Sequence, residues 1–481
     1  MPELSHGRRM LILAICCLSL LIVGMDVTIV NVALPSIRAD LDASVSGLQW
    51  TIDAYSVVLA SLLILSGSTA DRLGRRRTFQ VGLAVFTTGS LLCSIAPGLG
   101  WLVAFRMVQA VGGSMLNPVA MSIVTNVFTE PRERARAIGI FAGVVGLSLG
   151  IGPVLGGVLV DSIGWRSIFW VNVPIGVAAF VLAAIFVPES KALRARRIDP
   201  VGQVLVIVIL LSLTYAIIET PRLGDTWEIW GLGVVCGAAL VALLGYESRR
   251  EDPLIELAFF RSIPFSGATL MAVSGFSAFS AFLFLNTLYL QDVRGLSAME
   301  AGLFLLPMAA MTAVFPPISG RIVASRGPRI PLLVAGCAML LGALPLTRLT
   351  SDFSDGGLLA CYLVFGIGFG MLNAPITNAA VSGMPRSRAG VAAALASTSR
   401  QIGASLGVAV VGAIVSGGAG ATIRTEFAQA SHAGWWVVVG CAATVLLLAA
   451  ATTGQWAGRS TSKVAELLEV DDQQPVPAVG R

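Results

Sequence analysis

The sequence predicts an all-α integral membrane protein in which two six-helix bundles flank two inserted helices, giving fourteen transmembrane helices. Hydrophobic side chains make up 56% of the 481 residues and charged side chains only 12%, which is far from the composition of a soluble globular protein. Apolar runs of about 20 residues, each long enough to cross ~30 Å of hydrocarbon, recur along nearly the whole chain. Short charged or Gly/Pro-rich connections separate these runs, and little chain remains for a soluble domain.

The apolar runs place the helices in order, with each boundary accurate to about 2–4 residues. The predicted ranges are 10–34, 47–67, 78–97, 101–124, 138–159, 168–187, 200–219, 228–246, 263–288, 299–319, 330–349, 357–378, 391–416 and 433–455.

An internal similarity predicts the domain organisation. The stretch "SGSTADRLGRRR" follows the second predicted helix and "SGRIVASRGPR" follows the tenth, with glycines at 67 and 74 repeated 253 residues later. Repeats of this kind are typical of secondary transporters, although short basic loops can also look alike by chance. We expect a first bundle over 1–190, two inserted helices over 191–262, a second bundle over 263–456 and a cytoplasmic tail over 457–481.

The basic residues predict the orientation. With both termini in the cytoplasm, 24 of the 32 Lys and Arg residues lie in cytoplasmic segments, six in outer segments and two inside helices. Retention of positive charge on the cytoplasmic side favours this topology and an even number of helices. The basic residues therefore report topology rather than a nucleic-acid partner.

Two carboxylates lie inside the first two predicted helices. Asp26 in "MDVTIVNVALP" and Asp53 in "WTIDAYS" are both roughly 10–13 Å below the outer surface at 1.5 Å per residue. Intramembrane acids are costly and are usually functional, although each could instead be a satisfied packing group. At similar depth the two could share a cavity, where burial and mutual repulsion would let one of them carry a proton.

The fourth predicted helix carries a polar stripe. Arg106, Gln109, Gly113 and Asn117 recur at helical spacing on one face. A cation at this depth could compete with protons for the two aspartates, or it could form a structural ion pair.

The fifth predicted helix is rich in glycine. The stretch "GLSLGIGPVLGG" includes Gly152, Pro153, Gly156 and Gly157. Glycine allows a neighbouring helix to approach closely and an internal proline bends the helix. This pattern favours an interface that seals and pivots.

The late helices repeat the polar pattern more weakly. Asn373 on the twelfth predicted helix and Arg400 and Gln401 on the thirteenth either line a substrate cavity or belong to packing seams of small and polar residues. A phenylalanine cluster on the ninth predicted helix could stack on an aromatic drug or could be ordinary core. Its members are Phe276, Phe279, Phe282 and Phe284.

Several function classes are excluded or disfavoured. The seven cysteines lie within apolar runs without a CxxC spacing, and the two histidines, His6 and His432, are isolated, so we expect no metal site and no cofactor. Neither lysine follows a phosphate-binding loop, which excludes an ATP-driven pump in this chain. No nucleophilic constellation stands out, and we do not expect an enzyme.

Together these motifs resemble the major facilitator superfamily, and within it the fourteen-helix drug:proton antiporters, over essentially the whole chain. "GSTADRLGRRR" is similar to the family's loop motif, "RMVQAVGG" to its fourth-helix motif and "GPVLGG" to its antiporter motif. The loop motif is matched by Gly67, Asp71, Arg72, Gly74 and Arg75. Thr69 and Ser148 depart from the usual residues.

The resemblance implies alternating access, in which two bundles rock about a central site while a drug moves out and a proton moves in. Asp26 is then the first choice for the proton, and Asp53 is second, for proton or substrate. Exporters of quaternary ammonium compounds carry an Asp at the position of Asp53, which implies that cationic substrates are possible. Asp71, Arg72 and Arg75 would steady the inward-closed state.

The expected partners are a small-molecule drug or antibiotic, protons and the lipid bilayer. We expect a monomeric, multi-pass efflux transporter of a bacterial cell membrane that confers antibiotic resistance. Two alternatives stay open, a proton-coupled uptake symporter of the same fold and a membrane sensor or scaffold that moves no substrate.

Overall fold

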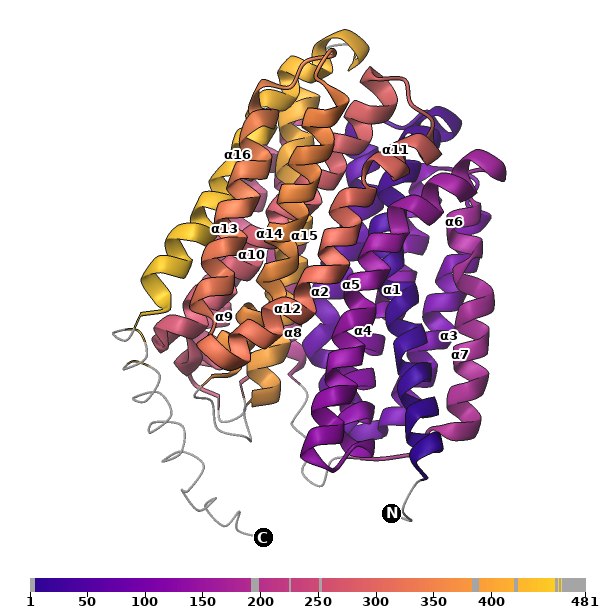
Figure 1. Ribbon diagram of the computed structural model, residues 1–481, viewed down its shortest axis with the longest axis vertical. Coiled ribbons are helices and arrows are strands. Elements are labelled where there is room, and N and C mark those ends of the chain that lie inside the picture. Colours follow the sequence, from indigo (N-terminus) through magenta and orange to yellow (C-terminus); the bar gives the residue numbers. More distant parts are fainter. Residues whose placement is uncertain are drawn as a thin grey trace.

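Figure 1 shows the computed structural model, which describes residues 5–191, 199–224, 226–250, 253–382, 389–418, 423–454, 457 and 460. Every regular element within these residues is helical, and the long helices run up and down the molecule. We call the end of the molecule where α1 starts the lower end and the end where α1 stops the upper end, as they stand in Figure 1.

The first half of the chain forms five long helices, a single short turn and a sixth long helix. They are α1 (His6–Leu41), α2 (Val45–Leu73), α3 (Arg75–Ser94), α4 (Leu99–Val127), α5 (Pro131–Ser162), α6 (Ser167–Trp170) and α7 (Asn172–Phe186). The predicted helix 168–187 is therefore broken at Val171. Pro174 in the first turn of α7 explains the break, because proline cannot donate a backbone hydrogen bond to the preceding turn.

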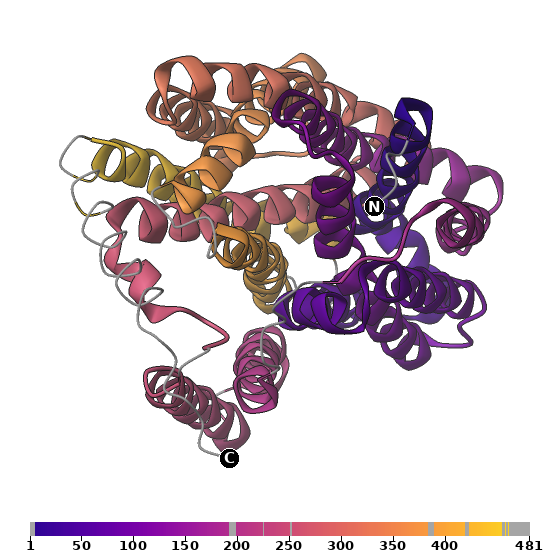
Figure 2. The same cartoon turned by 90° about the horizontal axis from the view of Figure 1, so that it is seen from below.

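Two helices form a hairpin between the halves. These are α8 (Pro200–Leu223) and α9 (Trp227–Glu247), which pack on each other. Figure 2 shows the hairpin at the edge of the molecule, and α8 touches both α2 and α15 (Ala389–Gly418). Nε2 of Gln203 on α8 donates to the backbone oxygen of Ser61 on α2 at 2.5 Å.

The second half repeats the up-and-down arrangement. Its other helices are α10 (Ile263–Leu288), α11 (Ala298–Phe304), α12 (Leu306–Arg326), α13 (Arg329–Ala343), α14 (Asp355–Val381) and α16 (Ile423–Thr452). A π-helical turn, Tyr289–Val293, extends α10, and 3₁₀ turns cover Leu257–Arg261 and Leu344–Arg348. The predicted helix 299–319 is divided into α11 and α12, because Pro307 at the start of α12 cannot continue the hydrogen bonds of α11.

Thirteen helical segments of the described chain are long and apolar enough to cross a membrane. Of the fourteen predicted spans, α3 is the one that falls short. It begins with three arginines and continues with several polar residues, and these lower its mean hydropathy. It nevertheless packs along α4 over much of its length, so its place among the long helices comes from packing.

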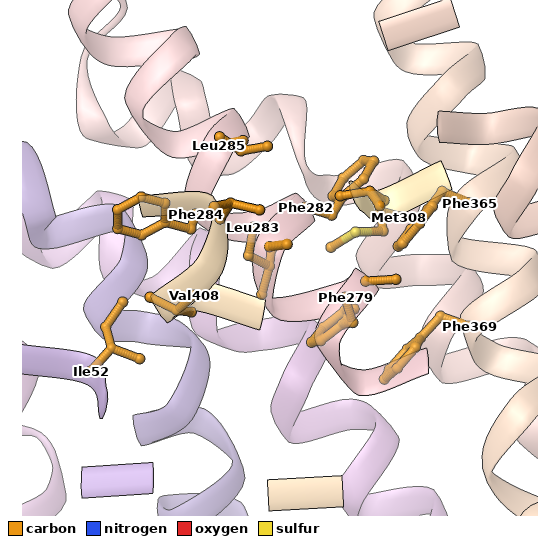
Figure 3. Packing of buried hydrophobic residues seen from close by; sticks show 14 of the residues in the cluster. Ile52, Phe279, Phe282, Leu283, Phe284, Leu285, Met308, Phe365, Phe369 and Val408 are labelled. Atoms are coloured by element: carbon orange, nitrogen blue, oxygen red, sulfur yellow. The ribbon is translucent and has the colours of Figure 1, made fainter. Parts of the chain in front are cut away.

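A large hydrophobic cluster joins the two halves. Figure 3 shows Ile52 of α2 and Val408 of α15 at one side of this cluster and aromatic rings of α10 and α14 at the other. The rings of Phe279 and Phe369 stack at 3.9 Å between centroids. Dense packing of this kind fixes the helices against which the polar side chains lie.

Candidate functional site

Asp26 and Arg106 form an ion pair inside the first half. Their side chains are 0% and 1% exposed. Nη1 of Arg106 donates to Oδ2 of Asp26 at 2.5 Å and to Oε1 of Gln109 at 2.7 Å. Nε2 of Gln109 donates to Oδ1 of Asp26 at 2.8 Å. The predicted stripe on α4 thus meets Asp26, and the two buried charges compensate each other.

Two further helices complete the hydrogen bonds of Asp26. Nδ2 of Asn172, at the start of α7, donates to Oδ1 of Asp26 at 3.1 Å. Oγ of Ser90 on α3 accepts from Nε2 of Gln109 at 2.6 Å. This close approach of α3 to α4 requires Gly89, because a Cβ added there would lie 2.6 Å from the backbone of Gln109.

Arg106 is held on its other side by α2 and by an aromatic ring. Its Nε donates to the backbone oxygen of Thr51 at 3.1 Å. Its guanidinium carbon lies 4.2 Å from the ring centroid of Tyr55, within the range of a cation–π contact. The cation is therefore fixed by a carboxylate, an amide, a carbonyl and a ring.

Asp53 lies elsewhere. Its carboxylate is 0% exposed, and neither oxygen has a hydrogen-bond partner among the described residues. One turn away on α2, Nε2 of Gln49 donates to the backbone oxygen of Ala409 on α15 at 2.8 Å. Ser405 of α15 supplies the hydroxyl group beside Asp53. This face of α2 is thus the seam with the second half.

The structure does not bring the two aspartates into one site. Asp53 and Tyr55 are roughly 200° apart around α2, since successive helical residues differ by about 100°. Tyr55 contacts Arg106, so Asp53 points away from the ion pair of Asp26. The expectation of a shared cavity is wrong in this conformation, because depth along two helices says nothing about the direction in which each side chain points.

The polar residues of the second half meet between α14 and α15. Nη1 of Arg400 donates to Oδ1 of Asn373 at 3.2 Å and to Oγ1 of Thr377 at 3.3 Å. Arg400 and Asn373 are half-buried, as are Gln401 on α15 and Asn117 on α4. Both partners of Arg400 are neutral, in contrast to those of Arg106.

Comparison with known proteins identifies the architecture. The sequence model of the Major Facilitator Superfamily matches residues 16–408. The chain belongs to the major facilitator superfamily. Membership makes this multi-pass membrane protein a transporter and not an enzyme, and it confirms the resemblance carried by the loop and helix motifs.

Curated relatives and a solved structure are similar over most of this transporter. The multidrug resistance protein Stp of Mycobacterium tuberculosis is 36% identical over 88% of this chain and 79% of its own length. The tetracenomycin C resistance and export protein of Streptomyces glaucescens is 36% identical over 89% of this chain and 79% of its own. The drug efflux pump JefA of M. tuberculosis is 32% identical over 89% and 84%, respectively.

The fold also matches a solved structure of a bacterial homologue of the human drug peptide transporters PepT1 and PepT2. The TM-score is 0.65 at 14% identity, and the match covers 97% of this chain and 100% of the other. At this identity the likeness concerns the fold alone.

The glycine-rich α5 of the transporter lies between α1 and the second half. A Cβ on Gly152 would lie 2.0 Å from Oγ1 of Thr28 on α1, and a Cβ on Gly157 would lie 2.5 Å from the carbonyl oxygen of Ala298 on α11. A Cβ on Gly156 would meet α1 in the same way, and Pro153 approaches α11 through its carbonyl. The motif residues therefore allow contact on both sides of α5.

Polar contacts join the two halves of the transporter at the upper end. Nη1 of Arg38 lies 3.4 Å from Oδ2 of Asp292, and Nε2 of Gln291 donates to the backbone oxygen of Val32 at 2.8 Å. The carboxylate of Asp161 on α5 accepts from the backbone N–H of Met299 on α11 at 2.8 Å. The halves thus hold together at this end.

The lower half of the same seam is looser. A Cβ added at Gly143 on α5, at Gly67 on α2 or at Gly320 on α12 would meet no described atom within 4 Å. These positions lie below those that clash in α5. The transporter is therefore closed at the upper end and separated at the lower end.

The loop motif at the lower end contacts its own half. Arg75 pairs with Asp71 at 3.1 Å, and Gly74 has φ 114°, which favours glycine. Glu189, after α7, accepts from the backbone N–H groups of Arg76 and Arg77 at 3.1 and 3.3 Å. Arg72 is exposed in the same turn.

Sequence reasoning missed two polar residues of this transporter. Asn172 was passed over because it is a lone amide in an apolar stretch, yet a buried amide in a predicted span is itself a signal. Glu219 was expected to reach water at the end of its helix. Instead it is 6% exposed and accepts from the indole N–H of Trp50 at 2.9 Å, which ties α8 to α2.

Proposed function

We propose that the protein is a proton-coupled antiporter that exports a drug or antibiotic across the bacterial plasma membrane and so confers resistance. The names of the three relatives, which specify resistance, export or efflux, support the direction of transport. The observation that carries proton coupling is Asp53, a fully buried carboxylate without a hydrogen-bond partner among the described residues, in the seam between the halves.

The lower end is cytoplasmic in this proposal, with both termini inside. The excess of Lys and Arg in the segments assigned to that side supports this orientation. The transporter works as a monomer, with bundles over 1–190 and 263–456, inserted helices over 191–262 and a tail over 457–481. Because the seam is closed at the upper end, the described conformation faces inward.

Asp53 carries the proton. A charged carboxylate inside a membrane costs about 2.5–3.5 kcal/mol on insertion scales, and the seam gives this one no donor strong enough to offset the cost. The closed seam is therefore stable with a neutral, protonated Asp53. Loss of the proton leaves a buried charge between α2 and α15, which favours their separation and the outward-facing state.

Asp26 becomes the second choice. Its carboxylate already accepts bonds from Arg106, Gln109 and Asn172, and these donors favour the charged form. Asp26 and Arg106 then act as a fixed pair that orients α1 against α4.

The substrate binds from the cytoplasmic side, in a cavity lined by Asn117, Asn373, Arg400 and Gln401, all of them half-buried. The α5 motif keeps α1 and α11 close enough to pivot. When the seam opens at the upper end, Asp71, Arg72 and Arg75 steady the closed cytoplasmic face. External protons then rebind Asp53 and close the seam again.

Inverted membrane vesicles with an acidic interior test the proposal. A panel that includes tetracenomycin C, methylenomycin A and lipophilic cations is added outside, and accumulation is followed with and without a protonophore. We expect accumulation that collapses when the proton gradient is removed. Expulsion of solute under the same gradient would indicate an uptake symporter, and absence of flux for every compound would indicate a sensor or scaffold.

Asp53→Asn tests the proton carrier in the same vesicles. We expect it to abolish gradient-driven accumulation, because asparagine stays neutral, while Asp53→Glu retains part of it. If Asp53→Asn still couples transport to the gradient, Asp53 does not carry the proton.

A further inference from the structure

We propose that the exported substrate is an aromatic compound with an acidic group, and that Arg400 binds the acidic group while Phe276 and Phe369 contact the aromatic body. This assignment of a substrate class rests on the proposed export function. It differs from the cationic substrates that the resemblance at Asp53 implies.

The first step is the charge of Arg400. Its guanidinium has two neutral partners, Asn373 and Thr377, and no described carboxylate lies within 4 Å of it. Arg106, the other arginine inside a predicted span, is neutralised by Asp26. A cation inside a membrane protein is costly without a counter-charge, so the site favours an anion that arrives with the substrate.

The second step is the geometry of the guanidinium. Both described hydrogen bonds of Arg400 start from Nη1. The remaining edge, formed by Nε and Nη2, is the one that can bind a carboxylate through two parallel hydrogen bonds. An acidic group can therefore bind without displacing Asn373 or Thr377.

The third step is access. Within the described chain α15 is packed against α2, α8, α10, α14 and α16, so lipid reaches little of its surface. Arg400 is nevertheless half-buried rather than buried. Since a cation directed at hydrocarbon is disfavoured, its exposed part faces the interior of the transporter, on the side that is separated at the lower end.

The fourth step is the aromatic surface. Phe369 lies one turn from Asn373 on α14 and therefore on the same face. Its ring stacks on Phe279 at 3.9 Å and meets the ring of Phe276 edge-on at 5.0 Å. Figure 3 shows Phe279 and Phe369 side by side, with Phe279 on α10. Phe276 is half-buried, so part of its ring is free to contact a planar ligand.

The bound charge also argues against a cation. Asp53 is sealed in the seam, and Asp26 is occupied by Arg106. A cationic drug in the lower part of the interior would lie near an uncompensated guanidinium. Like charges in a low-dielectric interior repel strongly, so the structure favours the acidic member of any pair of similar aromatic compounds.

Binding of three matched probes to the purified full-length protein in nanodiscs tests the proposal. The probes are 2-anthracenecarboxylate, its neutral carboxamide and 2-(aminomethyl)anthracene, followed by their fluorescence. We expect the carboxylate to bind about tenfold or more tightly than the amide, from one charge-assisted pair of hydrogen bonds. The amine should bind most weakly.

Variants locate the effect. Arg400→Gln should reduce the preference for the carboxylate over the amide to within about twofold, and Arg400→Lys should keep part of it. Arg348→Gln removes an equal charge from an exposed upper position and should change nothing. Phe369→Leu should weaken all three probes alike. Equal melting temperatures of the variants show that each is folded.

Three results would overturn the assignment. They are binding of the amine as tight as that of the carboxylate, failure of the carboxylate to bind, and an unchanged preference in both Arg400 variants. None of them depends on a proton gradient. Gradient-driven efflux without a preference for the anion would therefore reject the substrate class alone, and anion binding without efflux would reject the proposed function alone.

Discussion

The two intramembrane aspartates differ in what surrounds them. Asp26 accepts hydrogen bonds from an arginine and two amides, whereas neither oxygen of Asp53 has a partner among the described residues. Removal of a partner from a buried ion pair is costly because it leaves an uncompensated charge. The same type of residue is therefore structural in one position and suited to proton exchange in the other.

Substitutions at the ion pair test this difference at the scale of the residue. Asp26→Asn leaves Arg106 buried without its counter-charge, and we expect a loss of about 3–5 kcal/mol in folding stability. The double variant Asp26→Asn with Arg106→Gln should recover much of this loss. Melting in detergent, followed by tryptophan fluorescence, measures both.

Asp53→Asn is the matched comparison at the same scale. It replaces a neutral, protonated carboxyl with a neutral amide of similar shape, so its melting temperature should stay close to that of the parent protein. A large destabilisation by Asp53→Asn would mean that the seam holds a charged Asp53.

At the scale of the element, α5 contacts a helix from each half. Its glycines approach the backbone of α11 on one side and Thr28 and Ile29 of α1 on the other. Close contact over a long, small-residue face is a common way to pack membrane helices. A side chain on that face would force the two halves apart at the upper end.

Two alanine variants of α5 separate packing from general effects. At Gly157 a new Cβ would lie 2.5 Å from the carbonyl oxygen of Ala298, whereas at Gly143 it would meet no described atom within 4 Å. We expect Gly157→Ala to cost about 1–3 kcal/mol of the closed upper seam and to reduce efflux several-fold. Gly143→Ala should leave drug efflux from whole cells unchanged, and equal losses in both variants would contradict the role of the α5–α11 contact.

At the scale of the whole molecule, the halves contact each other at the upper end and are separated at the lower end. Arg38 with Asp292 and Gln291 with the backbone of Val32 link the upper ends of α1 and α10. α8 bonds to α2 through Glu219 and Gln203, while its contacts with α15 include Ile402 in an apolar cluster. The inserted hairpin is thus anchored to the first half, and we expect it to move with that half.

Distances between spin labels test the movement. One pair joins Pro97→Cys to Ser351→Cys at the upper end and the other joins Leu73→Cys to Ser325→Cys at the lower end, all exposed positions, without the native cysteines. Protonation of Asp53 stabilises the closed seam, so acidic buffer should shorten the upper distance and alkaline buffer should lengthen it. Asp53→Asn should keep the upper distance short at every pH, and a pH response in that variant would indicate a different titrating group.

Much of the fold could be predicted because helices in a membrane are constrained locally. The predicted spans overlap the observed helices, and the all-helical class and the superfamily are confirmed. The errors fall at Val171 and Leu305, where prolines shortly afterwards break a span that remains apolar throughout. Average hydrophobicity does not register such a break, because proline removes a hydrogen bond and not an apolar surface.

The sequence by itself determined which residues are polar inside the membrane, how deep they lie and which of them share a helix face, because helical periodicity and the cost of charge in lipid act on each segment alone. It therefore predicted that Arg106 and Gln109 act together. Only the tertiary structure decided that Asp26 binds this pair with the help of Asn172, while Asp53 faces α15. The partner of a side chain depends on how helices distant in sequence pack, and no local pattern contains that information.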